Sequence, residues 1–263
     1  MVNKPIVGVA ALIFVLAAVG IYYLRARNVP LPAAPAPAST APAASEPSIA
    51  HPLPGAGAGS SSGPLPDLAN SDAPLRDALA QLGGADAVKA YVVPEDVIRR
   101  LVVTIDNMPR QKIAVDKRPI TAIGGSFAAN GDELHATLNQ QNFERYKPLV
   151  AVISKLDMQQ LGAVYIHFYP LFQQAYQNLG YPNGYFNDRL VEVIDAMLAT
   201  PEPKGPIQLV RPNVMYTYAD PALEARPAGQ KLLIRMGPEN ARAVKAKLTE
   251  LRAIITAGSL KHQ

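Results

Sequence analysis

The stretch that decides the fold is "DMQQLGAVYIHFYPLFQQAYQNLG", residues 157–180. Its apolar residues recur at intervals of three or four, which is the spacing of one buried helix face. They are Met158, Leu161, Tyr165, Phe168, Phe172, Ala175 and Leu179. Asp157 followed by Gln160 forms a capping-box-like start, and Gly180 is typical of the position after a helix end. A long helix with a bend at Pro170 is therefore predicted, which makes the fold mainly α.

Helical periodicity and capping signals extend to both sides of this stretch. They predict further helices over residues 72–82, 94–108, 139–156, 187–198 and 238–255. Asp72 is expected to cap the first of these helices, Pro94 to begin the second, and Pro148 to kink or split the third. In the second helix one buried face is predicted, consisting of Val97, Leu101, Ile105 and Met108.

A small β component is also expected. Asn130-Gly131, between two short candidate strands, is the preferred chemistry of a tight hairpin turn. Extended runs are predicted at residues 207–210, 214–218 and 230–236. The expected fold class is therefore mainly α (α+β): a single compact helical domain with a small antiparallel sheet, over residues 71–257, followed by a tail over 258–263.

The N-terminal region has a different composition from the rest of the chain. Residues 6–24 read "IVGVAALIFVLAAVGIYYL", without a charge, and as a helix they would span roughly 28 Å, the thickness of a bilayer core. The alternative is a cleaved signal peptide, but the apolar core is longer than such peptides have and is followed by a poor cleavage site. A retained transmembrane anchor is predicted within residues 1–28.

Residues 29–70 are dominated by Ala, Pro, Ser and Gly, and ten of the 25 prolines fall between Pro30 and Pro66. Such a segment lacks the apolar side chains needed for a core, so a disordered linker is predicted. The chain contains no cysteine, which fits an oxidising compartment. With only a short tail before the span, we expect a single-pass protein of the inner (cytoplasmic) membrane whose domain faces the periplasm.

Three stretches carry a resemblance to a known family. They are "DNMPR" (106–110), "GYPNGYFNDRLVEVID" (180–195) and "GQKLLIRMGPENARAVKAKLTEL" (229–251). The chain resembles the bacterial family called domain of unknown function 3014 over roughly residues 70–257. Members similarly carry an N-terminal span or lipid anchor and a proline-rich linker. The resemblance implies an envelope protein and supplies no activity.

The sequence offers little catalytic chemistry. The four histidines form no H-x-x-x-H or H-E-x-x-H pair, and no phosphate-binding loop occurs. No catalytic residue, metal site or cofactor is predicted from these patterns. The alternative is an enzyme acting on envelope polymer, with Asp188 or Glu192 as its acid–base group, because burial can separate the pKa values of two neighbouring carboxyl groups.

The stretch "GYPNGYFNDRL", residues 180–190, contains more aromatic and charged residues than a turn requires. Asn187 is expected to cap the next helix. Two interpretations of the other residues remain open, a binding surface and a packed corner between helices. The candidate binding residues are Tyr181, Asn183, Tyr185, Asp188 and Arg189.

Charge gives the remaining indication of partners. Residues 99–118 contain six basic and two acidic residues, and residues 226–263 contain eight and two. If these surfaces adjoin, they form a basic face suited to an anionic polymer or an acidic envelope protein, whereas the simpler interpretation is ordinary solvated helix surface. No nucleic-acid-binding motif accompanies the charge. The function expected is that of a membrane-anchored, non-enzymatic binding or structural module.

Overall fold

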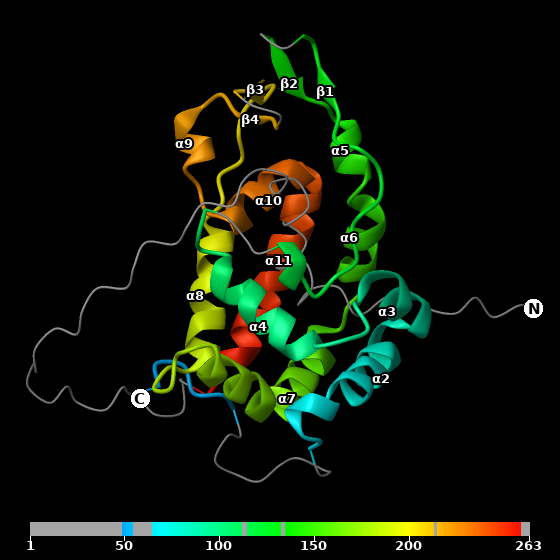
Figure 1. Ribbon diagram of the computed structural model, residues 1–263, viewed down its shortest axis with the longest axis vertical. Helices are drawn as coiled ribbons and strands as arrows, with labels where there is room; N and C mark the ends of the chain where they lie inside the picture. The colour runs from blue at the N-terminus through cyan, green and yellow to red at the C-terminus, as the bar shows by residue number, and fades with distance from the viewer. Residues whose placement is uncertain (1–48, 55–64, 112–114, 133–134, 213–214, 259–263) are drawn as a thin grey trace, which may run out of the picture.

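The computed structural model describes residues 49–54, 65–111, 115–132, 135–212 and 215–258 (Figure 1). The predicted membrane span and most of the predicted linker lie outside these residues. Within the described ranges, no single helix is both long and apolar enough to cross a bilayer. The helices 147–154 and 158–178, which meet at 88°, satisfy those criteria only as a pair, by length and composition.

The domain is mainly helical and carries one small antiparallel sheet, as predicted. Its helical elements are η2 (Leu68–Asn70), α2 (Asp72–Gly83), α3 (Ala85–Tyr91), α4 (Val97–Asn107), η3 (Val115–Lys117), α5 (Gln141–Glu144), α6 (Lys147–Ser154), α7 (Met158–Asn178), α8 (Phe186–Leu198), α9 (Pro221–Glu224), α10 (Ala228–Met236) and α11 (Pro238–Ile255). Its strands are β1 (Ala129–Asn130), β2 (Ala136–Leu138), β3 (Gln208–Val210) and β4 (Thr217–Tyr218).

Helix α7 organises the main core, since it packs against α2, α4, α8 and α11. The Asp157 carboxylate caps it by accepting the N–H groups of Gln159 and Gln160, as predicted. The predicted apolar face is buried except for its last member, Leu179, which lies past the helix end and is exposed. Gly162 lets α11 approach closely, because a Cβ there would lie 2.6 Å from a methyl carbon of Ile254.

The sheet forms a second, smaller lobe at the end of the molecule opposite α7 (Figure 1). Its strands pair in the order β1-β2-β3-β4, all antiparallel. The predicted hairpin exists, but Asn130 pairs with Thr137, so its connection is longer than the two-residue turn expected at Asn130-Gly131. A separate core fills this lobe and consists of Ala136, Leu138, Leu209, Tyr218 and Ile234.

Residues 230–236, predicted as an extended run, instead form most of helix α10. The reason is that α10 lies between the two cores. Leu232 and Leu233 join the main core, whereas Ile234 joins the core of the sheet lobe. A short helix buried on several sides shows no apolar periodicity, so its sequence cannot be distinguished from that of a buried strand.

Two predicted helix starts also differ from the structure. Helix α2 follows Ser71, and the Asp72 carboxylate instead accepts the N–H groups of Asp96 and Val97, each at 2.8 Å. Asp72 therefore supports the start of α4. That helix begins at Val97, three residues after Pro94, and its predicted apolar face is buried. Pro148 divides the predicted helix over 139–156 into α5 and α6, as expected.

Two stretches assigned to the disordered linker pack on the domain. Leu68 of η2 is buried, and so is Leu53 in the segment 49–54, which we call the strap. Residue Gly258 presses against the Pro52 carbonyl, where a Cβ would overlap it. These contacts differ from the expectation of disorder throughout 29–70, since a few apolar side chains within a polar, proline-rich segment suffice to hold it on a surface.

Candidate functional site

The loop between α7 and α8 is held in place by Gln173 of α7. The Gln173 amide donates to the carbonyl of Gly184 at 2.7 Å and accepts the N–H of Phe186 at 2.8 Å. Phe186 is 0 % exposed and stacks on Phe172, with ring centroids 5.6 Å apart and planes within 6°. The aromatic residue that anchors this loop in the core is therefore Phe186, which the sequence interpretation did not single out.

Asn187 does not cap α8, which corrects the prediction. Helix α8 begins at Phe186, the residue before Asn187. Tyr185 occupies the cap position and makes no side-chain cap bond. Asn187 is 1 % exposed, and its oxygen accepts the hydroxyl of Tyr165 at 3.1 Å. Its NH₂ group donates to the carbonyls of His51 and Ile255. One buried amide thus connects α7, the strap and the end of α11.

Asp188 binds the chain's own backbone. Its two carboxylate oxygens accept the N–H groups of Ala50 at 3.1 Å and of His51 at 2.7 Å. Glu192, its suggested partner in acid–base chemistry, accepts Arg189 at 2.7 Å and is 60 % exposed. Since one carboxylate is engaged by backbone amides and the other is a solvated ion pair, neither is placed as an acid–base group is usually placed.

Arg189 lies in a chain of charges with Asp106 and Glu192. Its Nη2 donates to the Asp106 carbonyl at 2.7 Å and lies 3.3 Å from the carboxylate of Asp106, which is 4 % exposed. Arg110 pairs with the same carboxylate at 2.8 Å. Burial alone would lower the pKa of Arg189, but Glu192 and Asp106 raise it, so the guanidinium stays charged.

The structure brings four of the five candidate binding residues together. They lie around a hollow of about 340 Å³ whose lining is Asp106, Tyr176, Tyr181, Tyr185, Asp188, Arg189 and Glu192. Tyr181 stacks on Tyr176, with ring centroids 4.6 Å apart, and Tyr185 is half-buried. Asn183 is exposed and is not part of the lining.

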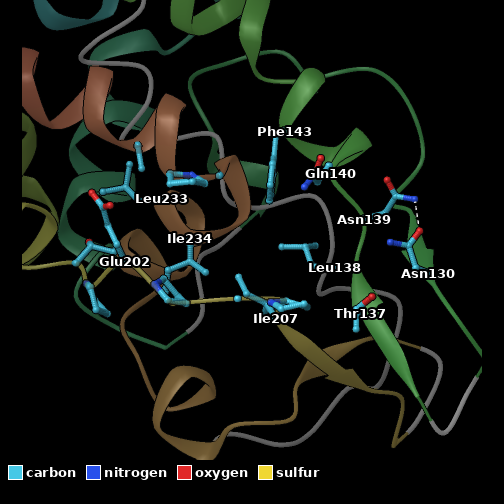
Figure 2. A pocket seen from close by; sticks show the side chains of 18 of the residues that line it. Asn130, Thr137, Leu138, Asn139, Gln140, Phe143, Glu202, Ile207, Leu233 and Ile234 are labelled. Atoms are coloured by element: carbon cyan, nitrogen blue, oxygen red, sulfur yellow. Dashed lines mark hydrogen bonds between the residues drawn. The ribbon is translucent and has the colours of Figure 1, made fainter.

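A larger cleft of about 690 Å³ lies between the sheet lobe and the helical body (Figure 2). It is lined by Asn130 of β1, residues of β2 and α5, the segment 200–207, α10 and the start of α11. Sequence analysis missed this site. It placed Asn130 in a hairpin turn and Ile207 in an extended run, and it did not connect the two because the contributing segments meet only in the folded chain.

The cleft combines an apolar floor with an amide-bearing rim. Figure 2 shows Leu138 between the ring of Phe143 and Ile207, and Asn130, Asn139 and Gln140 along one edge; Ile234 is also part of the lining. The Asn139 amide donates to the Asn130 side chain at 2.6 Å. Such a mixture of apolar surface and a few polar groups is typical of small-molecule sites at junctions between structural units.

Gly237 fixes one wall of the cleft. Its φ is +84°, and a Cβ there would come within 2.5 Å of the ring of Phe143. The backbone conformation and the space both favour glycine. Asn240 holds the same wall by donating to the Phe143 carbonyl at 2.9 Å. The ring is therefore positioned before any ligand arrives.

The two charged side chains in the lining of the cleft already have hydrogen-bond partners within the fold. Glu202 forms an ion pair with Arg242 at 3.2 Å, and the Lys245 ammonium donates to the carbonyl of Thr200. Among the lining residues, Glu202 and Lys245 are the ones that carry charge. The ion pair neutralises Glu202, whereas Lys245 keeps its positive charge, so the lining carries one cation among otherwise uncharged residues.

Two of the histidines lie in ordinary contacts with their neighbours in the chain. His167 meets Phe168 edge-on, and His135 lies 3.2 Å from Asp132 near the hairpin. In the described part of the chain, no group of three or more His, Cys, Asp or Glu side chains is placed to hold a metal ion.

The two basic segments do meet in the fold. The backbone N–H groups of Ala228 and Gly229 donate to the carbonyls of Arg110 and Met108, which joins the end of α4 to the start of α10. Several of their charges are paired with acidic groups, however, such as Arg252, which bonds Asp195 through two nitrogens. The basic segments therefore adjoin, with their charge partly neutralised.

Comparison with known proteins identifies the family. The family model described as "Protein of unknown function (DUF3014)" matches residues 97–252, a range that includes the α7–α8 loop and most of the cleft. Searches of curated proteins and of solved structures gave no match. The matched range covers more than half of the chain, and the three stretches that suggested the resemblance all lie within it. The chain belongs to the DUF3014 family.

Proposed function

We propose that the chain is a single-pass membrane protein of the bacterial envelope whose helical domain faces the periplasm and acts as a non-enzymatic binding module. The apolar segment at residues 6–24 and the proline-rich composition of the following residues support the anchor. The absence of cysteine supports an oxidising compartment.

The observation that carries the binding role is the cleft between the two lobes. It has a preformed aromatic wall, a lining of mostly uncharged residues and polar amides on one rim. Its charged lining residues are held by Arg242 and by a backbone carbonyl. These properties suit recognition of an uncharged group more than acid–base chemistry.

The ligand that fits this lining is a neutral unit with one apolar and one hydrogen-bonding face, such as an N-acetylated sugar of an envelope glycan. Asn139 already bonds Asn130 and the Gln141 N–H, whereas the exposed Gln140 amide can both donate to and accept from hydroxyl and acetamide groups. The floor formed by Leu138, Ile207 and Ile234 covers C–H faces and a methyl group. A neutral unit also avoids the cost of burying a charge in the cleft.

The test is co-sedimentation of the full chain, in detergent, with protein-free insoluble envelope glycan. Ile207→Arg places a charge in the cleft, so we expect binding to fall at least tenfold. Val210, at the end of β3 and three residues after Ile207, is exposed and outside the lining, so Val210→Arg should bind like the wild type. Equal binding by wild type and Ile207→Arg would contradict this role of the cleft.

The same material tests the enzymatic alternative. Asp188→Asn combined with Glu192→Gln removes both carboxylates suggested for acid–base chemistry. We expect the wild type to release no soluble fragments from the glycan. Release by the wild type that is lost in the double variant would replace the binding proposal with an enzymatic one.

A further inference from the structure

We propose that the surface formed by the start of α8 and the end of α11 is a docking site for the chain's own strap, residues 49–54, and that docking sets how far the domain reaches from the membrane. The reach rests on the proposed membrane anchor, whereas the docking does not. Figure 1 shows the strap in blue beside the turn between α7 and α8.

Polar contacts hold the backbone of the strap. The Asp188 carboxylate accepts the N–H groups of Ala50 and His51, and the Asn187 amide donates to the His51 carbonyl at 2.7 Å. Bonds to an ionised acceptor are stronger than bonds between neutral groups. Three backbone polar groups of the strap are thus bonded to two adjacent residues of α8.

Apolar contacts fix the other end of the strap. Leu53 is 6 % exposed and belongs to the main core. Gly258, just after α11, presses against Pro52 so closely that any side chain there would overlap its carbonyl. The strap is therefore bound through backbone polarity at one end and through burial at the other, as an extended peptide is bound by a partner.

The docking site also accounts for the composition of the α7–α8 corner. Asn187 and Asp188 exceed the needs of a turn, and both direct their polar atoms to residues about 136 positions earlier in the chain. Asp188 also lies in the first turn of α8, where the helix dipole favours a negative charge. A carboxylate suited to a ligand is here used to recognise the chain itself.

The consequence for the tether follows from residue counts. With the strap docked, residues 29–48 separate the predicted anchor from the domain, at most about 60 Å at roughly 3.1 Å per residue. With the strap released, residues 29–64 do so, about 110 Å on the same basis. Docking therefore shortens the reach of the domain by nearly half, and release of the strap extends it.

The experiment uses the full chain in lipid nanodiscs and two measurements. Hydrogen exchange reports docking at the amides of Ala50 and His51. The chain has no cysteine of its own, so a dye can be attached at Lys204→Cys alone, and energy transfer from this dye to labelled headgroups reports reach. In Asp188→Ala, we expect exchange at both amides to become at least tenfold faster and energy transfer to decrease.

The matched control is Glu192→Ala, which removes a carboxylate from the same helix without touching the strap, and it should change neither measurement. Gly258→Ala provides a second, independent disruption, should Asp188→Ala perturb α8 itself, and we expect it to act in the same direction.

Each outcome bears on a separate claim. Free-peptide exchange rates at Ala50 and His51 in the wild type would overturn the docking site. Faster exchange in the variants without a change in energy transfer would overturn its control of reach. Background energy transfer in the wild type, with both amides protected, would show that the membrane anchor is wrong while the docking site stands.

Discussion

The α7–α8 corner and the cleft between the lobes differ in where their polar side chains bond. At the corner, Asn187 and Asp188 bond the chain's own backbone, and Arg189 bonds Asp106. In the cleft, Asn139 and Asn130 bond each other, but the Gln140 amide is exposed at the rim of an apolar floor. The corner has the chemically richer sequence, and the cleft has the more available surface. A concentration of polar residues therefore indicates a ligand site only when their hydrogen-bonding atoms are not already used within the fold.

The largest effect that sharpens this comparison is expected at Phe186. Phe186→Ala removes a fully buried ring that stacks on Phe172 and should lower the free energy of unfolding by about 3–5 kcal/mol. Tyr185→Ala, at a half-buried position, should cost only about 1 kcal/mol. Urea unfolding of the full chain in detergent measures both. A larger loss for Tyr185→Ala would mean that the corner is anchored differently from the structure.

The next effect concerns Asn187. Asn187→Ala leaves the Tyr165 hydroxyl and the carbonyls of His51 and Ile255 without their partner, at a cost of about 2–3 kcal/mol. Asn183→Ala, four residues earlier and exposed, should stay within about 0.5 kcal/mol of the wild type. Similar small losses in both variants would restore the interpretation of this corner as a surface whose polar groups face outward.

The stability of the sheet lobe is expected to depend on pH through Glu224. Burial opposes ionisation of Glu224, but the Tyr218 N–H and Lys231 outweigh it and lower the pKa of this carboxyl group below 4.5. A carboxyl group whose pKa is lower in the folded state contributes its full stabilisation at pH values above its unfolded-state pKa. This contribution is lost as the pH falls through the folded-state pKa. Wild type should therefore lose stability below about pH 4.5 more steeply than Glu224→Gln, in melting curves followed by circular dichroism.

Much of the main helical core was predictable from sequence, and the reasons are local. The α7 face and the α4 face follow from apolar spacing, and Asp157 and Pro148 act within a few residues of their own positions. Apolar residues at regular intervals of three and four indicate a helix with one buried side. Leu179 departs from it because the helix has ended before that residue.

The predictions that were wrong, and the site that was missed, depend on contacts between residues far apart in the chain. Asp72 supports the start of α4, which lies 25 residues later in the chain, and α10 is buried between two cores. Neither segment therefore shows the local pattern from which its structure was predicted. The cleft is built from segments far apart in the chain, and no single segment carries its signature. At the corner, sequence indicated that Asp188 was unusual, but its partner is a strap 137 residues away.

The smallest effect is the sharpest test of the comparison, because it involves one exposed amide in each region. Gln140→Ala, at the rim of the cleft, should leave the free energy of unfolding within about 0.5 kcal/mol of the wild type. It should nevertheless weaken glycan binding about fivefold, since one hydrogen bond to a neutral ligand contributes about 1 kcal/mol. Asn183→Ala removes a similar exposed amide at the corner, outside the hollow, and should change neither stability nor binding. Because neither substitution affects the core, a difference between them in co-sedimentation reports the surface alone. Weakened binding in Asn183→Ala with normal binding in Gln140→Ala would move the ligand site from the cleft to the corner.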